Sequence, residues 1–188
     1  MVATRNNKKV EEILKKGGVG VMLTDTIYGL LGKALEEETV KRIYALKKRN
    51  PEKPCIILIQ SIYDLELFGI QINEKEKEAV KELWSGSRPT SIVFKCTEEK
   101  FSYLHRNTNT LALRLPRSKS LLKLLSKTGP LIATSANPEG LSPAKSIDMA
   151  KDYFENSVDF YAGRNTTNET HSRLVSLNED GSIKILRE

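Results

Sequence analysis

The 188 residues of this chain are enough for one domain with a buried core, and 39% hydrophobic and 29% charged residues are typical of a globular protein. No apolar run reaches the roughly 18 residues of a transmembrane helix, and residues 1–16 lack the apolar block of a signal peptide. The net charge of +6 favours anionic partners such as nucleotides or RNA. We therefore expect a cytoplasmic protein with no membrane partner.

Apolar periodicity in the first half of the chain predicts two helices and two strands. Gly17 and Gly18 would end the first helix, and Pro51 would stop the second. The predicted elements are a helix from about residue 10 to 16, a strand over 19–23, a helix over about 40–49 and a fully buried strand over 55–59.

The second half predicts a capped helix first, because Asn73 and Glu76 have the spacing of a capping box. Its apolar face includes Trp84, which we interpret as a core residue. In the strand over 110–115, three leucines alternate with Ala112 and Arg114, so Arg114 points away from the leucine face. The other predicted elements are strands over 92–95 and 131–133, helices over 121–125 and 147–154, and a terminal hairpin over 173–177 and 183–186.

This loose alternation predicts an α/β fold in which a mixed, twisted sheet is flanked by helices. No internal repeat or long linker divides the chain, so residues 1–188 are interpreted as a single domain.

Common catalytic and metal-binding motifs are absent from the sequence. It contains neither the Gly-x-x-x-x-Gly-Lys-Ser/Thr loop nor a Gly-x-Ser-x-Gly elbow. The two histidines, His105 and His171, are far apart, so no protein-held metal is expected. Cys55 and Cys96 are expected to be buried free thiols.

Three polar motifs remain, each at the end of a predicted strand or helix, where α/β proteins place ligands. They are Thr-Asp-Thr-x-Tyr-Gly-Leu at 24–30, Lys-x-Arg at 47–49 and Ser-Ala-Asn at 135–137. In this order the motifs resemble the YrdC-like family of threonylcarbamoyl-AMP synthases, over about residues 17–187. The resemblance implies an open basic cavity and the short, single-domain form of the family.

The activity that the resemblance implies joins L-threonine, bicarbonate and ATP into threonylcarbamoyl-AMP and pyrophosphate, for threonylcarbamoyl modification of tRNA adenosine. The carboxylated threonine is itself the nucleophile, so no catalytic side chain is required beyond positioning and electrostatics by Arg49, Lys53 and Arg114. Mg²⁺ would be carried by the ATP phosphates. The implied partners also include tRNA or double-stranded RNA and a downstream tRNA threonylcarbamoyl-transfer complex.

Residue roles carry over from the family pattern. The residues at the ATP-binding positions are Lys47, Arg49, Lys53, Thr110, Ser135, Asn137 and Arg187. Those at the L-threonine positions are Thr26, Arg114, Ala133 and Ser172. The chain departs from the pattern at Glu139, where the family has serine, at Arg173, where it has threonine, and around Arg88.

Alternative interpretations stay open at this point. Arg114 fits a solvated strand edge as well as a site, and residues 47–53 fit an ordinary basic helix end. A carbamoyl-adenylate-forming domain is a second enzymatic hypothesis. A non-catalytic RNA-binding module is also compatible with the charge, although 6% aromatic residues give little support to base stacking.

Overall fold

The computed structural model describes residues 2–3, 7–163 and 170–188. Ten strands of that portion form one sheet in the order β1-β8-β2-β3-β7-β4-β6-β5-β9-β10. The strands are β1 (Val2–Ala3), β2 (Gly20–Leu23), β3 (Tyr28–Lys33), β4 (Ile56–Leu58), β5 (Thr90–Lys95), β6 (Thr110–Arg114), β7 (Leu131–Ser135), β8 (Phe160–Ala162), β9 (Arg173–Leu177) and β10 (Ile183–Arg187).

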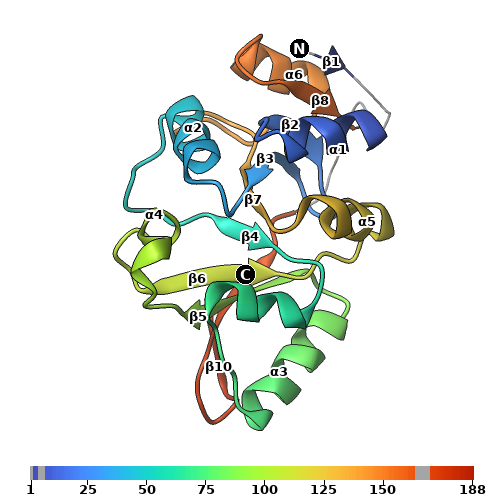
Figure 1. Cartoon of the computed structure of the whole chain (residues 1–188). Coiled ribbons are helices and arrows are strands. Elements are labelled where there is room, and N and C mark those ends of the chain that lie inside the picture. Colours follow the sequence, from blue (N-terminus) through green and yellow to red (C-terminus); the bar gives the residue numbers. More distant parts are fainter. Residues whose placement is uncertain (1, 4–6, 164–169) are drawn as a thin grey trace.

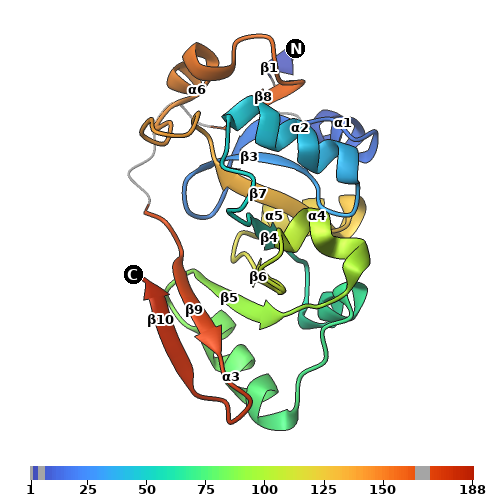
Figure 2. The same ribbon diagram turned by 90° about the vertical axis from the view of Figure 1, so that its left-hand side faces the viewer.

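The α-helices are α1 (Asn7–Lys15), α2 (Glu37–Lys47), α3 (Glu74–Ser85), α4 (Ser102–His105), α5 (Lys119–Thr128) and α6 (Ile147–Phe154), with short 3-10 turns over Ile62–Phe68 and Glu99–Phe101. The strand pairs β4–β6 and β5–β9 are parallel, whereas β2–β3, β3–β7 and β5–β6 are antiparallel. The predicted mixed α/β sheet is confirmed, and Figures 1 and 2 show its strong twist.

Neighbouring residues along the central strands belong to two separate cores. Leu30 and Ile57 pack into a core that includes side chains of α2, α3 and α4, while Leu31 and Leu58 pack into a second core with α1 and α5. Because successive side chains of a strand point to opposite faces, the helices cover the central sheet on both sides. Figure 1 shows α1 and α5 on the side opposite α2 and α4.

Most elements expected from the sequence are present. The Asn73 amide oxygen accepts the Glu76 backbone N–H, while the Glu76 carboxylate accepts the Asn73 N–H, which completes the predicted capping box. Trp84 lies in the core, and both cysteines are buried and free. The terminal hairpin forms from β9 and β10.

Three strands and one α-helix were not predicted from the sequence, namely β1, β3, β8 and α4. The first three residues of β3 belong to the polar motif at 24–30, yet this strand is buried between β2 and β7. β8 is only three residues long and lies against β2, where Gly20 permits close approach. A Cβ at Gly20 would lie 2.3 Å from the Phe160 ring, so only glycine fits. Among the described residues, no helix combines the length and hydrophobicity needed to cross a bilayer.

Candidate functional site

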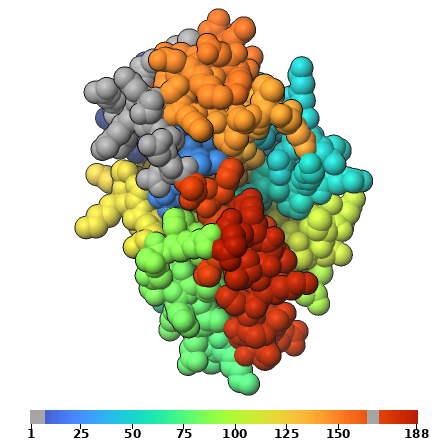
Figure 3. Space-filling view, turned by 180° about the vertical axis from the view of Figure 1, so that it is seen from behind, coloured from blue at the N-terminus to red at the C-terminus, as the bar shows by residue number. Residues whose placement is uncertain are grey.

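A cavity of about 290 Å³ lies where the motifs at 24–30, 47–49 and 135–137 approach one another. Its wall combines the loop between β2 and β3, the segment before β4, the strands β5, β6 and β7, and the tail around β9. Three arginines from different parts of the chain, Arg49, Arg114 and Arg187, line it. Figure 3 shows the C-terminal hairpin in red against the green segment that contains β5, on the face opposite that of Figure 1.

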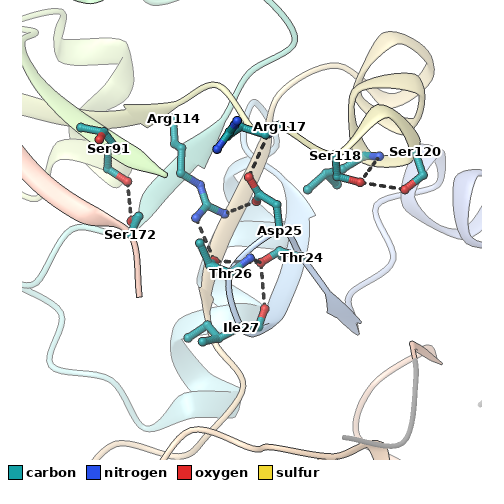
Figure 4. A network of polar contacts seen from close by, with 12 residues as sticks. Thr24, Asp25, Thr26, Ile27, Ser91, Arg114, Arg117, Ser118, Ser120 and Ser172 are labelled. Carbon is teal, nitrogen blue, oxygen red and sulfur yellow. Dashed lines mark hydrogen bonds and ion pairs between the residues drawn. The ribbon is translucent and has the colours of Figure 1, made fainter. Parts of the chain in front are cut away.

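Arg114 is held from below by the loop between β2 and β3 (Figure 4). Its Nη1 donates to Thr26 Oγ1 at 2.8 Å, and Nη2 lies 3.2 Å from Asp25 Oδ1. The contact between Arg114 and Asp25 is an ion pair without hydrogen-bond geometry, so Asp25 Oδ1 accepts no hydrogen bond. Arg114 Nε separately has no acceptor. Burial lowers the pKa of Arg114, an effect that the adjacent Asp25 carboxylate opposes. The Arg114 side chain, 4% exposed, lines the cavity and keeps donors that its protein partners do not occupy.

The loop that presents Arg114 with its partners is rigid because its own side chains close it. Thr24 Oγ1 donates to the Ile27 carbonyl at 2.8 Å and lies 3.0 Å from Thr26 Oγ1. The Asp25 Oδ2 atom accepts the Arg117 backbone N–H at 2.9 Å. The tight turn before β3 thus fixes both side chains that face Arg114.

The segment after α2 forms a second wall, which we call the basic loop (residues 48–54). Arg49 donates from Nε to the Lys53 carbonyl at 3.0 Å and from Nη2 to the Pro54 carbonyl at 2.9 Å. Tyr44, in α2, donates its hydroxyl to the same Lys53 carbonyl at 2.8 Å, and burial raises the pKa of this phenol to about 12. The Arg49 guanidinium is thereby fixed at the cavity wall.

Lys47 supports the cavity from beneath without lining it. Its ammonium is buried and donates to the carbonyls of Ser135 and Asn137, each at 2.5 Å. Burial, followed by the charge of Arg49, lowers the pKa of Lys47 to about 8. These carbonyls replace water around the ammonium, so Lys47 holds the 135–137 turn in this structure.

The tail closes the far side of the cavity. Arg187 Nη2 donates to the Ser172 carbonyl at 2.9 Å, and the Ser172 and Ser91 hydroxyls lie 2.9 Å apart (Figure 4). Burial lowers the pKa of His171, which also lines the cavity, and the charge of Arg187 acts in the same direction. This arrangement brings residues over 80 positions apart in sequence to one site.

The family model for Sua5/YciO/YrdC, described as "Telomere recombination", matches residues 12–188. The chain belongs to this family. A threonylcarbamoyl-AMP synthase of Pyrococcus abyssi is 31% identical over 88% of the chain and 49% of that protein, and one of Stutzerimonas stutzeri is 25% identical over 85% of each. The structure of P. abyssi Sua5 complexed with L-threonine matches with a TM-score of 0.84 at 27% identity, over 96% of the chain and 53% of Sua5.

The chain thus spans about half the length of its P. abyssi relative. The structural match to Sua5 extends over 96% of the chain, so the fold of the Sua5/YciO/YrdC family is present over nearly all of it.

The structure brings eight of the residues expected from the family pattern to the cavity wall. They are Thr26, Arg49, Thr110, Arg114, Ala133, Ser135, Ser172 and Arg187. Lys53 and Asn137 do not line the cavity, since Lys53 pairs with Glu139 and the Asn137 amide donates to the carbonyls of Pro138 and Leu141.

Asp25 and His171 also belong to the site, although the sequence analysis gave neither of them a ligand-binding role. Asp25 lies within the motif at 24–30 and was assigned no role there, although it pairs with Arg114 in the structure. His171 was considered only as a metal ligand, and its position just before Ser172 was the signal that could have placed it at the cavity.

Proposed function

We propose that this chain is an L-threonylcarbamoyladenylate synthase, a nucleotidyltransferase that uses L-threonine, bicarbonate and ATP. The observation that carries the proposal is Arg114, a buried guanidinium whose donors are not exhausted by its protein partners and which lines the cavity. A carboxylate is the ligand that matches such a fork. The similarity to the threonylcarbamoyl-AMP synthases of P. abyssi and S. stutzeri supports the same activity.

We assign the amino-acid end to the part of the cavity around β6 and the loop before β3. Arg114 would bind the carboxylate of L-threonine, with Thr26, Ala133 and Ser172 around the rest of the amino acid. The hydrogen bonds that Thr26 forms with Arg114 and Thr24 support this assignment, because they restrict the orientation of the guanidinium.

We assign the ATP end to the basic loop and the tail. Arg49 and Arg187 would bind phosphate oxygens, with Thr110 and Ser135 as neutral donors, while Lys53 would join from the basic loop. Lys47 and Asn137 would act indirectly by holding the turn that carries Ser135.

The proposed chemistry needs positioning more than a catalytic side chain. The threonine amine attacks the carbon of bicarbonate and forms a carbamate with loss of water. A carbamate oxygen then bonds to the α-phosphorus of ATP as the bond to the bridging oxygen breaks, and pyrophosphate leaves with the electron pair. Three guanidinium groups around one cavity would bring the anionic reactants together and neutralise their repulsion.

Mg²⁺ would arrive on the ATP phosphates and add further charge neutralisation. Within the described residues no cluster of three His, Cys, Asp or Glu side chains suited to a metal ion occurs, so the phosphates would supply the ligands together with water. We also propose that residues 1–188 act as one domain, and that the product passes to a complex that transfers the threonylcarbamoyl group to tRNA adenosine.

Pyrophosphate release tests the proposal directly. Purified protein with ATP and Mg²⁺ should release pyrophosphate only when both L-threonine and bicarbonate are present, and mass spectrometry should identify threonylcarbamoyl-AMP. Release that depends on carbamoyl phosphate instead would indicate a carbamoyl-adenylate-forming domain. RNA binding without any pyrophosphate release would indicate a binding module.

A further inference from the structure

Glu139 occupies two donors of the basic loop, one of which, the Lys53 ammonium, the proposed function assigns to ATP. Its Oε1 accepts a hydrogen bond from Lys53 Nζ at 2.6 Å, and its Oε2 accepts the backbone N–H of Asn50. The donation from Lys53, followed by that from Asn50, lowers the pKa of the Glu139 carboxyl. An ammonium and a backbone N–H are also the donors that bind phosphate oxygens in proteins.

The backbone around this contact is fixed, so the ion pair can break without moving the loop. The Glu139 N–H donates to the Lys47 carbonyl at 2.7 Å, which ties the residue to the end of α2. On the other side, Tyr44 and Arg49 both donate to the Lys53 carbonyl. The Lys53 side chain is 59% exposed and the Glu139 side chain 30%, so both can rotate in solvent while their backbones stay in place.

From these contacts we propose that Glu139 is an internal competitor for nucleotide phosphate, which holds Lys53 and the Asn50 N–H until ATP displaces it. This inference rests on the proposed function, and it adds a residue that sets the affinity for ATP. Lys53 is absent from the cavity wall in this structure because its ammonium is turned to Glu139. Release of the ion pair would let the flexible lysine stem reach the phosphates.

Glu139→Gln tests the idea because glutamine keeps the size of the side chain and removes its charge. Calorimetric titration with ATP and Mg²⁺ should give a dissociation constant about two- to fivefold lower than that of the wild type, the range expected for releasing one exposed ion pair. Titration with inorganic triphosphate should give the same gain, while the affinity for L-threonine should not change. High salt should shrink the difference, because salt screens the exposed pair.

Two further variants separate competition from other effects. Glu52→Gln removes an exposed carboxylate of the same loop and should leave the ATP affinity at the wild-type value, which controls for the change in net charge. In a Lys53→Met background, Glu139→Gln should lose most of its gain, because the released donor is missing. Thermal unfolding of every variant checks that each is folded.

The results of these titrations decide whether Glu139 competes with ATP. Unchanged or weaker ATP binding by folded Glu139→Gln overturns the competitor role, and weaker binding would mean that Glu139 shapes the loop for ATP. An equal gain in Glu52→Gln overturns it as well, since net charge alone would then explain the effect. If the wild type binds ATP but the variants do not differ, only this inference fails. If neither the wild type nor Glu139→Gln binds ATP, the proposed function fails with it.

Discussion

Replacing Arg114 by lysine keeps one positive charge in the cavity and removes the planar fork, so it isolates what the guanidinium contributes. In the wild type, Nη1 and Nη2 face Thr26 and Asp25 at 2.8 and 3.2 Å, and other donors remain for a ligand. A lysine ammonium at this place must choose between the Asp25 carboxylate and an incoming carboxylate. We therefore expect Arg114→Lys to lose at least one charged hydrogen bond to L-threonine.

The size of the effect follows from that single bond. A hydrogen bond to a charged group contributes about 1.5–3 kcal/mol, which corresponds to a dissociation constant for L-threonine about 10- to 150-fold higher. The affinity for ATP should change by no more than about twofold, because Arg49 and Arg187 reach the cavity from other elements and remain in place. The buried Asp25 keeps a positive partner, so the variant should still fold.

Isothermal calorimetry with L-threonine and with ATP, measured separately, checks this prediction. Arg42→Lys is the matched control, because Arg42 forms an arginine–carboxylate pair with Asp159 at 2.6 Å that is not part of the cavity wall. The control should leave both affinities unchanged. Equal losses for both ligands in Arg114→Lys, or no loss for either, would refute the assignment of Arg114 to the threonine carboxylate.

Three further predictions concern the other cations around the cavity. Arg49→Ala should lower the rate of pyrophosphate release at least about tenfold, because a charged hydrogen bond to phosphate is lost, and an unchanged rate would contradict its role. Arg187→Ala should weaken ATP binding in calorimetry without lowering the melting temperature substantially. Lys184→Ala on the same exposed strand should change neither the ATP affinity nor the melting temperature. Lys47→Met tests the buried ammonium through pH. The pKa of Lys47 is lowered to about 8 in the folded state from an ordinary 10.5, so the unfolded chain holds more protons between these values and stability rises with pH. The free energy of unfolding of the wild type, measured by urea denaturation relative to Lys47→Met, should therefore increase from pH 8 to 10.5, and a difference that does not vary with pH would count against the buried ammonium.

Local sequence patterns were sufficient for most of the helices and strands. Burial imposes a period of about 3.6 on a helix and of two on a strand, and both periods can be read from consecutive residues. The alternation around Arg114 is an example, because it placed Leu111 and Leu113 in the core and the arginine on the opposite face. The capping box at Asn73 was equally local, since its two partners are three residues apart.

The missed elements had no such local signal. β8 has three residues, too few for a period to be recognised. β3 begins inside the polar motif at 24–30, and its buried character comes from lying between β2 and β7. Pairing with strands distant in sequence, rather than its own composition, makes it part of the sheet.

What the sequence determined by itself is therefore the class of fold and the residue types at the site, because periodicity and motif order are written along the chain. The tertiary structure alone decided which cations face the cavity. Lys47 and Arg49 are two residues apart, yet one ammonium is buried among carbonyls 88 and 90 positions away while the other side chain lines the wall. Lys53 likewise meets Glu139 only because the 135–137 turn packs against α2. A cation that leaves water needs hydrogen-bond acceptors from the protein, and the packing of distant segments decides which acceptors lie within its reach.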